Sequence, residues 1–142
     1  MIRLTARALC AASLVIAPLT LSSPAQAATS CTVNGVPVTS GTVNGTAGSD
    51  FIQCSTVNAG DTVNGLGGND YIVVTGDVNG TVRGGAGGDY VQVNNVSPSG
   101  QVSGDSENDF LRAGLNLGLV NGGTGFDVCR VSGGNTPLSC EV

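Results

Sequence analysis

Five aspartates recur at nearly constant spacing through the middle of the chain, and each follows a glycine by five residues. They are Asp50, Asp70, Asp89, Asp109 and Asp127, at intervals of 20, 19, 20 and 18 residues, after Gly45, Gly65, Gly84, Gly104 and Gly122. If each interval folds into one turn of a coil, the carboxylates form a column. Such a column repels itself, and a hard cation between successive carboxylates relieves the repulsion. The chemistry first indicated is therefore cation binding by oxygen ligands.

The residues between each glycine and its aspartate suit the same chemistry. Further glycines stand at Gly48, Gly68, Gly87 and Gly125. Because glycine adopts positive φ readily, a loop rich in it can turn several carbonyl oxygens toward one point. Ca²⁺ accepts about six to eight oxygens in a relaxed geometry, whereas Mg²⁺ demands a tighter octahedron. We therefore predict calcium as the bound ion, with these five aspartates and nine glycines as the metal-site residues.

The charge balance excludes several classes of function. The chain has ten acidic residues, five arginines, no histidine and no lysine. Mechanisms that need a nucleophile–histidine pair, a lysine Schiff base or histidine-bound metal are therefore excluded, and we expect no enzyme. Residues 28–142 keep three arginines against ten acids, a net charge of −7. That charge argues against nucleic acid and anionic membranes as partners.

The first 27 residues have the features of a secretory signal peptide. Arg3 and Arg7 supply the positive start, residues 8–21 are uncharged and mostly apolar, and Ala25-Gln26-Ala27 provides a small-residue cleavage site. The apolar run is too short and too weakly apolar to anchor the chain in a membrane. We expect a secreted, extracellular protein whose mature part, residues 28–142, is one domain without a membrane span.

The intervals also indicate which elements must position the aspartates. Nine residues before each aspartate stands another turn residue, so every interval contains two short segments joined by two turns. After each aspartate the second and fourth residues are apolar or cysteine, as in Ile72 and Val74, while the third is mostly polar. This period of two is typical of strands with one buried face. On the return segments, the inward positions are the valines Val43, Val63, Val82, Val102 and Val120. The sequence predicts an all-β fold, a parallel β-roll or β-solenoid of about five turns.

Four cysteines remain after the signal peptide, which is typical of two disulfides in an exported chain. They allow three pairings, and a zinc site is disfavoured because no C-x-x-C spacing is present. Cys54 belongs to the first turn and Cys31 to the segment before it. Cys129 belongs to the last turn and Cys140 to the tail after it. Because a disulfide spans only about 7 Å between Cα atoms, a stack of turns favours pairing within each end. We therefore predict disulfide-pinned caps at residues 28–35 and 132–142, around repeats at residues 36–131.

The residue after each aspartate forms a second column, consisting of Phe51, Tyr71, Tyr90, Phe110 and Val128. Strand alternation places these side chains on the outer surface. Aromatic stacking between strands explains such a column structurally. The alternative is a binding face for surface glycans or a partner protein.

The five loops together resemble the haemolysin-type, or repeats-in-toxin, nonapeptide family, whose pattern is G-G-x-G-x-D-x-U-x. The loops that begin at Gly84 and Gly122 match all four fixed positions, whereas the loop at Gly104 keeps only its first glycine and Asp109 and has Glu107 in place of a glycine. The resemblance implies a parallel β-roll with calcium between successive loops and a structural or adhesive role. An N-terminal signal departs from the C-terminal export signal frequent in this family.

Two other interpretations remain open at this stage. Glycine and aspartate are good turn residues in themselves, and ladders of Asn or Asp stabilise solenoids without metal. A polysaccharide-modifying enzyme is the more remote alternative, because some such enzymes use or carry β-solenoids. The absence of lysine and histidine disfavours it.

Overall fold

The computed structural model describes residues 27–141, which contain twelve β-strands and no helix. The strands are β1 (Thr29–Val33), β2 (Val36–Ser40), β3 (Thr42–Asn44), β4 (Phe51–Cys54), β5 (Thr62–Gly67), β6 (Tyr71–Val78), β7 (Thr81–Ala86), β8 (Tyr90–Val96), β9 (Gln101–Ser106), β10 (Phe110–Asn116), β11 (Leu119–Thr124) and β12 (Val128–Gly134). Nothing in this part of the chain is a helix suited to crossing a membrane. The predicted signal peptide lies outside the described residues, apart from Ala27.

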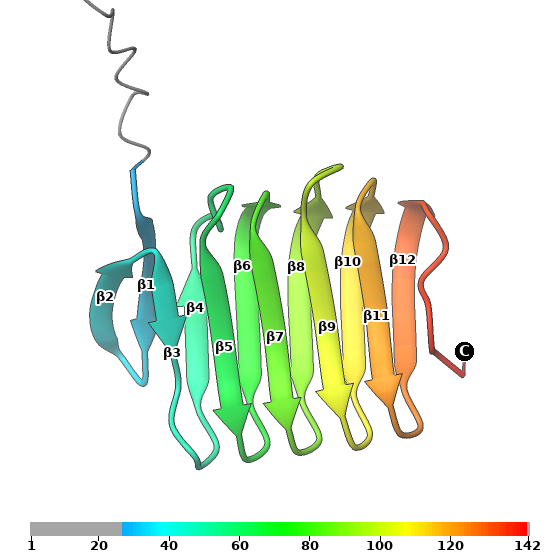
Figure 1. Cartoon of the computed structure of the whole chain (residues 1–142), viewed down its shortest axis with the longest axis horizontal. Coiled ribbons are helices and arrows are strands. Elements are labelled where there is room, and N and C mark those ends of the chain that lie inside the picture. The colour runs from blue at the N-terminus through cyan, green and yellow to red at the C-terminus, as the bar shows by residue number, and fades with distance from the viewer. Residues whose placement is uncertain (1–26, 142) are drawn as a thin grey trace, which may run out of the picture.

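The strands form two sheets that face each other along the whole length of the body (Figure 1). The larger sheet has the order β12-β10-β8-β6-β4-β1-β2, and the smaller has the order β11-β9-β7-β5-β3. Each strand of the smaller sheet is followed in the chain by one of the larger sheet, so β3–β4, β5–β6, β7–β8, β9–β10 and β11–β12 are the five turns of a solenoid. Neighbouring turns pair in parallel. The predicted fold class is confirmed.

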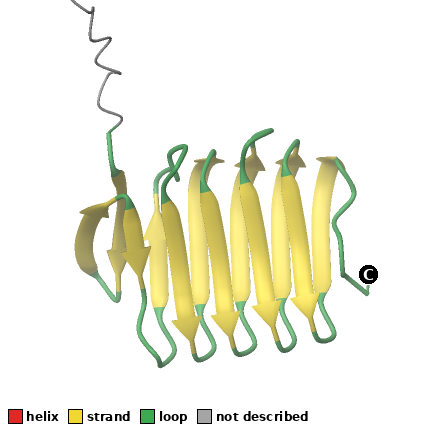
Figure 2. Cartoon of the chain, viewed as in Figure 1, coloured by secondary structure: helices red, strands yellow, loops and turns green. Residues whose placement is uncertain are grey.

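Alternation of apolar side chains explains why these segments form strands. In β6, Ile72 and Val74 are buried between the sheets, whereas Val73 between them faces outward and is half-buried. The five valines of the return strands are also buried. Because side chains alternate in direction along a strand, every second residue of each turn enters one shared core. Short loops join the strands at both ends of each turn (Figure 2).

A third column of inward-facing side chains fills the core next to the upper loops, which follow the strands β4, β6, β8 and β10 of the larger sheet (Figure 1). It consists of Val57, Val78, Val96 and Asn116, each fully buried. Three of them follow the last inward residue of their strand by three positions, and Val78 follows by four because β6 contains a bulge between Val74 and Asp77. The sequence prediction missed this column because the lengths of these loops vary. The offset of three residues, or four at the bulge, was the signal that could have found it.

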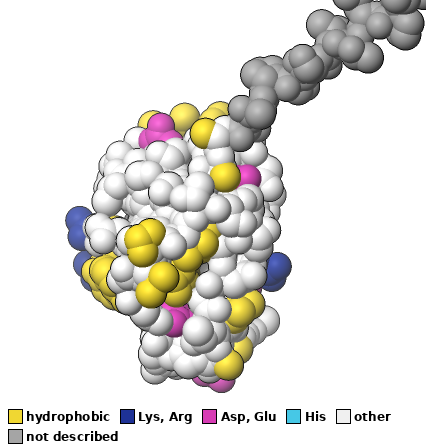
Figure 3. Space-filling model, turned by 90° about the vertical axis from the view of Figure 1, so that its left-hand side faces the viewer, with side chains coloured by type: hydrophobic (Ala, Val, Ile, Leu, Met, Phe, Trp, Pro, Cys, Tyr) yellow, Lys and Arg dark blue, Asp and Glu magenta, His cyan; other side chains and the backbone are white. Residues whose placement is uncertain are grey.

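The N-terminal end is closed by a hairpin. β1 pairs antiparallel with both β2 and β4, and the hairpin turns at Asn34 and Gly35, which have φ values of 52° and 81°. β2 therefore belongs to the cap, although its residues lie within the stretch predicted as repeats. Figure 3 shows hydrophobic side chains gathered at this end of the body, where Val36 is 62% exposed.

Both predicted disulfides are present, one at each end of the stack. Cys31 and Cys54 are register partners on β1 and β4, and their sulfurs are bonded. Cys129 on β12 is bonded to Cys140 in the tail. The tail also covers the edge of β11, because the N–H of Leu138 donates to the carbonyl of Val120. Each disulfide therefore fastens a capping segment to its own end of the solenoid.

Two adjacent residues on β6, Ile72 and Val73, test this division into inner and outer faces. We expect Ile72→Ala to lower the free energy of unfolding by about 2–5 kcal/mol, because it leaves a cavity in a closed core. Val73→Ala, its matched control, should change it by less than about 1 kcal/mol. Chemical denaturation of both variants measures the difference. Equal losses would contradict the placement of Ile72 between the sheets.

Candidate functional site

The five predicted aspartates form an internal ladder along the lower edge of the solenoid. Each stands immediately before a strand of the larger sheet, and all five are buried, at 0–4% exposure. The main-chain N–H of each of the first four aspartates donates to Oδ1 of the aspartate on the next turn, as from Asp50 to Asp70 at 2.8 Å. The same bond joins Asp70 to Asp89, Asp89 to Asp109, and Asp109 to Asp127. The structure thus brings the predicted carboxylates into one column.

The other carboxylate oxygen lacks a donor in four of the five rungs. Oδ2 of Asp70, Asp89, Asp109 and Asp127 is buried without a hydrogen-bond partner. Only in Asp50 is Oδ2 satisfied, by the N–H and hydroxyl of Thr46. A buried carboxylate oxygen without a partner is costly unless the group is protonated or neutralised by a cation.

The first glycine of each loop makes room for these carboxylates. A Cβ built on Gly65 would overlap both Oδ2 of Asp70 and the carbonyl oxygen of Gly84 on the next turn. Gly45, Gly84 and Gly104 make equivalent approaches to their own aspartate and to the next glycine carbonyl. At Gly122 the carbonyl of Ser139 in the tail takes the place of a sixth turn. At each step, therefore, a carboxylate oxygen and a carbonyl oxygen from consecutive turns lie against one glycine.

The remaining loop glycines have a different role. Gly68, Gly87 and Gly125 have φ values of 95°, 122° and 140°, a region that disfavours other residues. Gly48 does not share this backbone conformation, and a Cβ on it would meet only the hydroxyl of Thr46 at 3.9 Å. The first loop therefore differs from the others, and Gly48 is not required as glycine by its surroundings.

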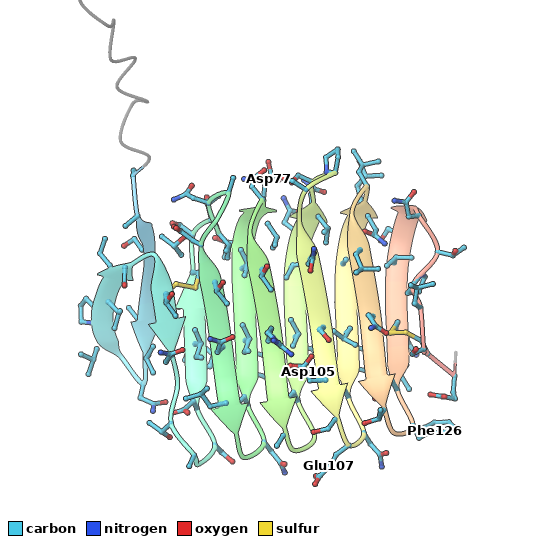
Figure 4. All side chains as sticks on the ribbon, viewed as in Figure 1. Asp77, Asp105, Glu107 and Phe126 are labelled. Atoms are coloured by element: carbon cyan, nitrogen blue, oxygen red, sulfur yellow. A yellow bond between two sulfur atoms is a disulfide. The ribbon has the colours of Figure 1, made fainter. Side chains whose placement is uncertain are left out.

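The fourth loop keeps the same path without the glycines. Asp105 and Glu107 adopt φ values of 82° and 78°, where the third and fifth loops have glycine. Asp105 pairs with Nε of Arg83 at 2.7 Å and also accepts from the hydroxyl of Ser103. Glu107 is exposed and points away from the body (Figure 4). Neither carboxylate turns into the ladder, so they do not replace the missing glycines as ligands.

Two residues that the sequence prediction missed end the ladder. Asn34, in the hairpin turn, donates from its amide to Oδ1 of Asp50 and accepts from the N–H of Phe51. At the other end, the N–H of Asp127 donates to the carboxylate of Glu141 in the tail. The hairpin and the tail therefore continue the ladder pattern beyond the five turns. Neither residue lies in a repeat, so only the folded caps reveal these roles.

Burial shifts the acidities of the ladder in a graded way. Although burial acts to raise it, hydrogen bonds from Thr46 and Asn34 leave the pKa of Asp50 lowered. Burial raises the pKa of Asp70, and the charge of Asp50 adds to the effect. Burial also raises the pKa of Asp89 to about 6 and that of Asp109 to about 7, with neighbouring carboxylates adding to both. The middle of the ladder is therefore where negative charge is least tolerated.

The aromatic column on the outer face is a stacked ladder. The ring centroids of Phe51, Tyr71, Tyr90 and Phe110 are 5.5, 4.8 and 5.1 Å apart in succession, and the two later pairs are parallel within 5°. Because the ring faces cover one another, mainly their edges meet solvent. This arrangement supports stacking between strands as the role of the column, rather than a flat platform for sugar rings.

The donor atoms along the ladder are carboxylate and carbonyl oxygens. No three Asp, Glu, His or Cys side chains within residues 27–141 converge in a way that could hold a metal. The ladder instead offers, at each step, an orphaned carboxylate oxygen and a loop carbonyl oxygen. Such oxygen donors suit calcium and offer neither nitrogen nor thiolate to a softer metal. A hollow of about 550 Å³ lies beside Asp70, Asp89 and Asp109 and is bordered by Phe126.

Comparisons with protein-family models, curated proteins and solved structures find no match to this chain.

Two loop glycines with different places in the sequence motif and different surroundings provide a test of the ladder. We expect Gly65→Ala to reduce the free energy of unfolding by about 2 kcal/mol or more, because the methyl group overlaps the Asp70 carboxylate and a backbone carbonyl. Gly48→Ala should change it by no more than about 0.5 kcal/mol. Thermal or denaturant unfolding of the two variants decides the matter. A harmless Gly65→Ala would show that the carboxylate does not lie against the glycine.

The raised acidities predict an unusual pH dependence for the metal-free protein. The folded pKa values of Asp89 and Asp109, about 6 and about 7, lie above the ordinary value of 3.8, so the folded state holds more protons between these limits. Stability should therefore be full below about pH 4 and decrease as the pH rises to about 7, by at most about 1.4 kcal/mol per group and pH unit. In chelator, the melting temperature should fall by roughly 5–10 °C over this window. The double variant Asp89→Asn, Asp109→Asn should give a flatter profile, and an unchanged profile would contradict the raised values.

Proposed function

We propose that this protein is a secreted, calcium-binding β-roll in which calcium neutralises the internal aspartate ladder and stabilises the solenoid. One observation carries the proposal, namely the column of buried aspartate oxygens that lack a hydrogen-bond donor. Asp50, Asp70, Asp89, Asp109 and Asp127 would hold the ions together with carbonyl oxygens of the loops. The bound ion would supply positive charge between carboxylates that otherwise repel one another.

The character of the donors supports calcium rather than another metal. The ligands available on the ladder are carboxylate and carbonyl oxygens, and the four cysteines of the described part are in disulfides. Residues with positive φ at alternate positions of the loops can turn carbonyl oxygens toward an ion, and Ca²⁺ does not require the strict octahedron that Mg²⁺ does. The resemblance of the loops to the haemolysin-type pattern points to the same ion.

Calcium would act here as a structural element. The ladder lies inside the turns, at 0–4% exposure, and it spans every turn of the stack. A ligand that binds only the folded form stabilises it by mass action. The protein would then be fully stable where calcium is plentiful, as it is outside cells. Two disulfides at the ends support an oxidising compartment, consistent with the predicted signal peptide.

The residue composition of the chain and the stacking of its surface aromatic rings favour a structural or adhesive role over catalysis. The chain has neither histidine nor lysine. The stacked rings Tyr71 and Tyr90 present edges rather than open faces. If this protein binds glycans or cell-surface proteins, it would therefore do so through a surface other than the aromatic column.

Calcium titration of the mature protein tests the proposal. We expect calcium to raise the melting temperature relative to chelator at neutral pH, with an affinity on the order of 10⁻⁴ M and about 2.7 kcal/mol of stabilisation per site at a hundredfold excess over Kd. Asp89→Asn should remove much of this gain. In chelator the same variant should be at least as stable as the natural chain, because its amide relieves repulsion and can donate to a carbonyl.

Asp77 offers a matched control for that substitution. It is an exposed aspartate near the end of β6, at the opposite edge of the solenoid from the ladder (Figure 4). Asp77→Asn should leave calorimetric calcium binding unchanged. If calcium and chelator give the same melting curve and circular dichroism spectrum, the ladder is a metal-free device and the proposal is wrong.

A further inference from the structure

Two arginines lie side by side on the outer face of the larger sheet. Arg112 on β10 and Arg130 on β12 are register partners on neighbouring parallel strands, and both side chains are exposed. Like charges placed opposite each other across two strands destabilise a sheet. Within residues 27–141 the ion pair involves Arg83 and Asp105, and neither of these two arginines lies within ion-pair distance of a carboxylate. The pair therefore has unsatisfied positive charge.

The surroundings hold this pair in place and leave space around it. The guanidinium of Arg130 lies over the ring of Phe110, 5.6 Å from its centroid, at the end of the aromatic ladder. A hollow of about 330 Å³ on one side is lined in part by Gln92, Asn94 and Arg112. A second hollow of about 300 Å³ lies between Phe110 and the two arginines. Arg112 and Ser132 line both, so the hollows adjoin.

The charge distribution limits what the pair can bind. Residues 28–142 have a net charge of −7, so a dense polyanion such as nucleic acid would be repelled by most of the surface. When the body is viewed down its long axis, arginine side chains project from its two flanks, and acidic side chains lie toward its upper and lower edges (Figure 3). Two guanidinium groups suit one isolated oxyanion, because each can donate two parallel hydrogen bonds.

We propose that Arg112 and Arg130 bind the carboxylate of an acidic saccharide that lies across the outer face of the larger sheet. The groups around the pair are amides and hydroxyls, from Gln92, Asn94 and Ser132, which suit sugar hydroxyls. The exposed lining of both hollows is more polar than apolar, although Tyr90 and Phe110 border the second, and a polar lining suits a sugar better than an apolar peptide anchor. This site lies on the outside of the solenoid and does not depend on calcium in the ladder.

The test compares binding of a galactose oligomer that carries a single galacturonate residue with binding of the neutral galactose oligomer of the same length, measured by calorimetry on the mature protein. We expect binding of the acidic oligomer alone, weakened by added salt. Arg112→Gln and Arg130→Gln should each reduce its affinity about tenfold or more. Arg83→Gln is the matched control, since Arg83 lies on the opposite sheet and is already paired, and it should leave the affinity unchanged.

The stability of the variants separates binding from folding. Because each substitution removes a like-charge neighbour, the melting temperatures of Arg112→Gln and Arg130→Gln should stay within a few degrees of the natural chain. Equal affinity for neutral oligomers, an equal loss with Arg83→Gln, or equal binding of a glutamate-rich peptide would each overturn the proposal. Calcium binding measured on the same variants should be unaffected, so failure of this site and failure of the ladder are distinguishable.

Discussion

The structure depends on one repeated interaction, the hydrogen bond from the N–H of each ladder aspartate to the carboxylate of the next. It joins consecutive turns at a place where the absence of a Cβ on the first glycine of the loop leaves room for the second carboxylate oxygen. That bond sets the register of the turns. The same register then aligns the buried valines, the outer aromatic rings and the loop carbonyls.

This interaction stabilises and destabilises the fold at the same time. Each bond places another carboxylate next to the previous one in a buried column, and the pKa values of Asp89 and Asp109 rise as a result of burial and neighbouring charge. The second carboxylate oxygens of the column can be satisfied by protonation, by amide donors or by cations. At its N-terminal end Asn34 and Thr46 already do so for Asp50, which shows how amide and hydroxyl donors satisfy a rung. The middle rungs lack such donors, and this difference is the physical basis for proposing calcium there.

The ends of the solenoid face a different constraint, because an open stack exposes both core and strand edges. The hairpin covers the first turn, and its edge strand β2 contains Pro37, which has no N–H to offer another chain. The tail covers β11 and places Ser139 and Glu141 where a sixth turn would supply a glycine carbonyl and an aspartate. Cys129 and Val131 of the last strand are only partly buried, since no further turn packs over them. The disulfides fasten both covering segments in addition to these hydrogen bonds.

Much of this architecture could be predicted from the sequence because a solenoid is governed by local repetition. The spacing of Asp50 to Asp127 determines the number of turns, the alternation in segments such as Ile72-Val73-Val74 determines the inner face, and the positions of the cysteines determine their pairing once turns are stacked. Other features were decided only in three dimensions. The sequence does not distinguish a carboxylate that faces solvent from one that turns inward against a glycine, and it contains no repeat that marks Asn34 or Glu141 as the ends of the ladder. The sequence also does not show that Asp105 and Glu107 of the fourth loop stay out of the ladder, where Arg83 on the preceding turn pairs with the first and solvent surrounds the second. The physical reason is that repetition along the chain determines how each turn folds. Contacts between turns and with the caps determine which polar atoms are left without hydrogen-bond partners.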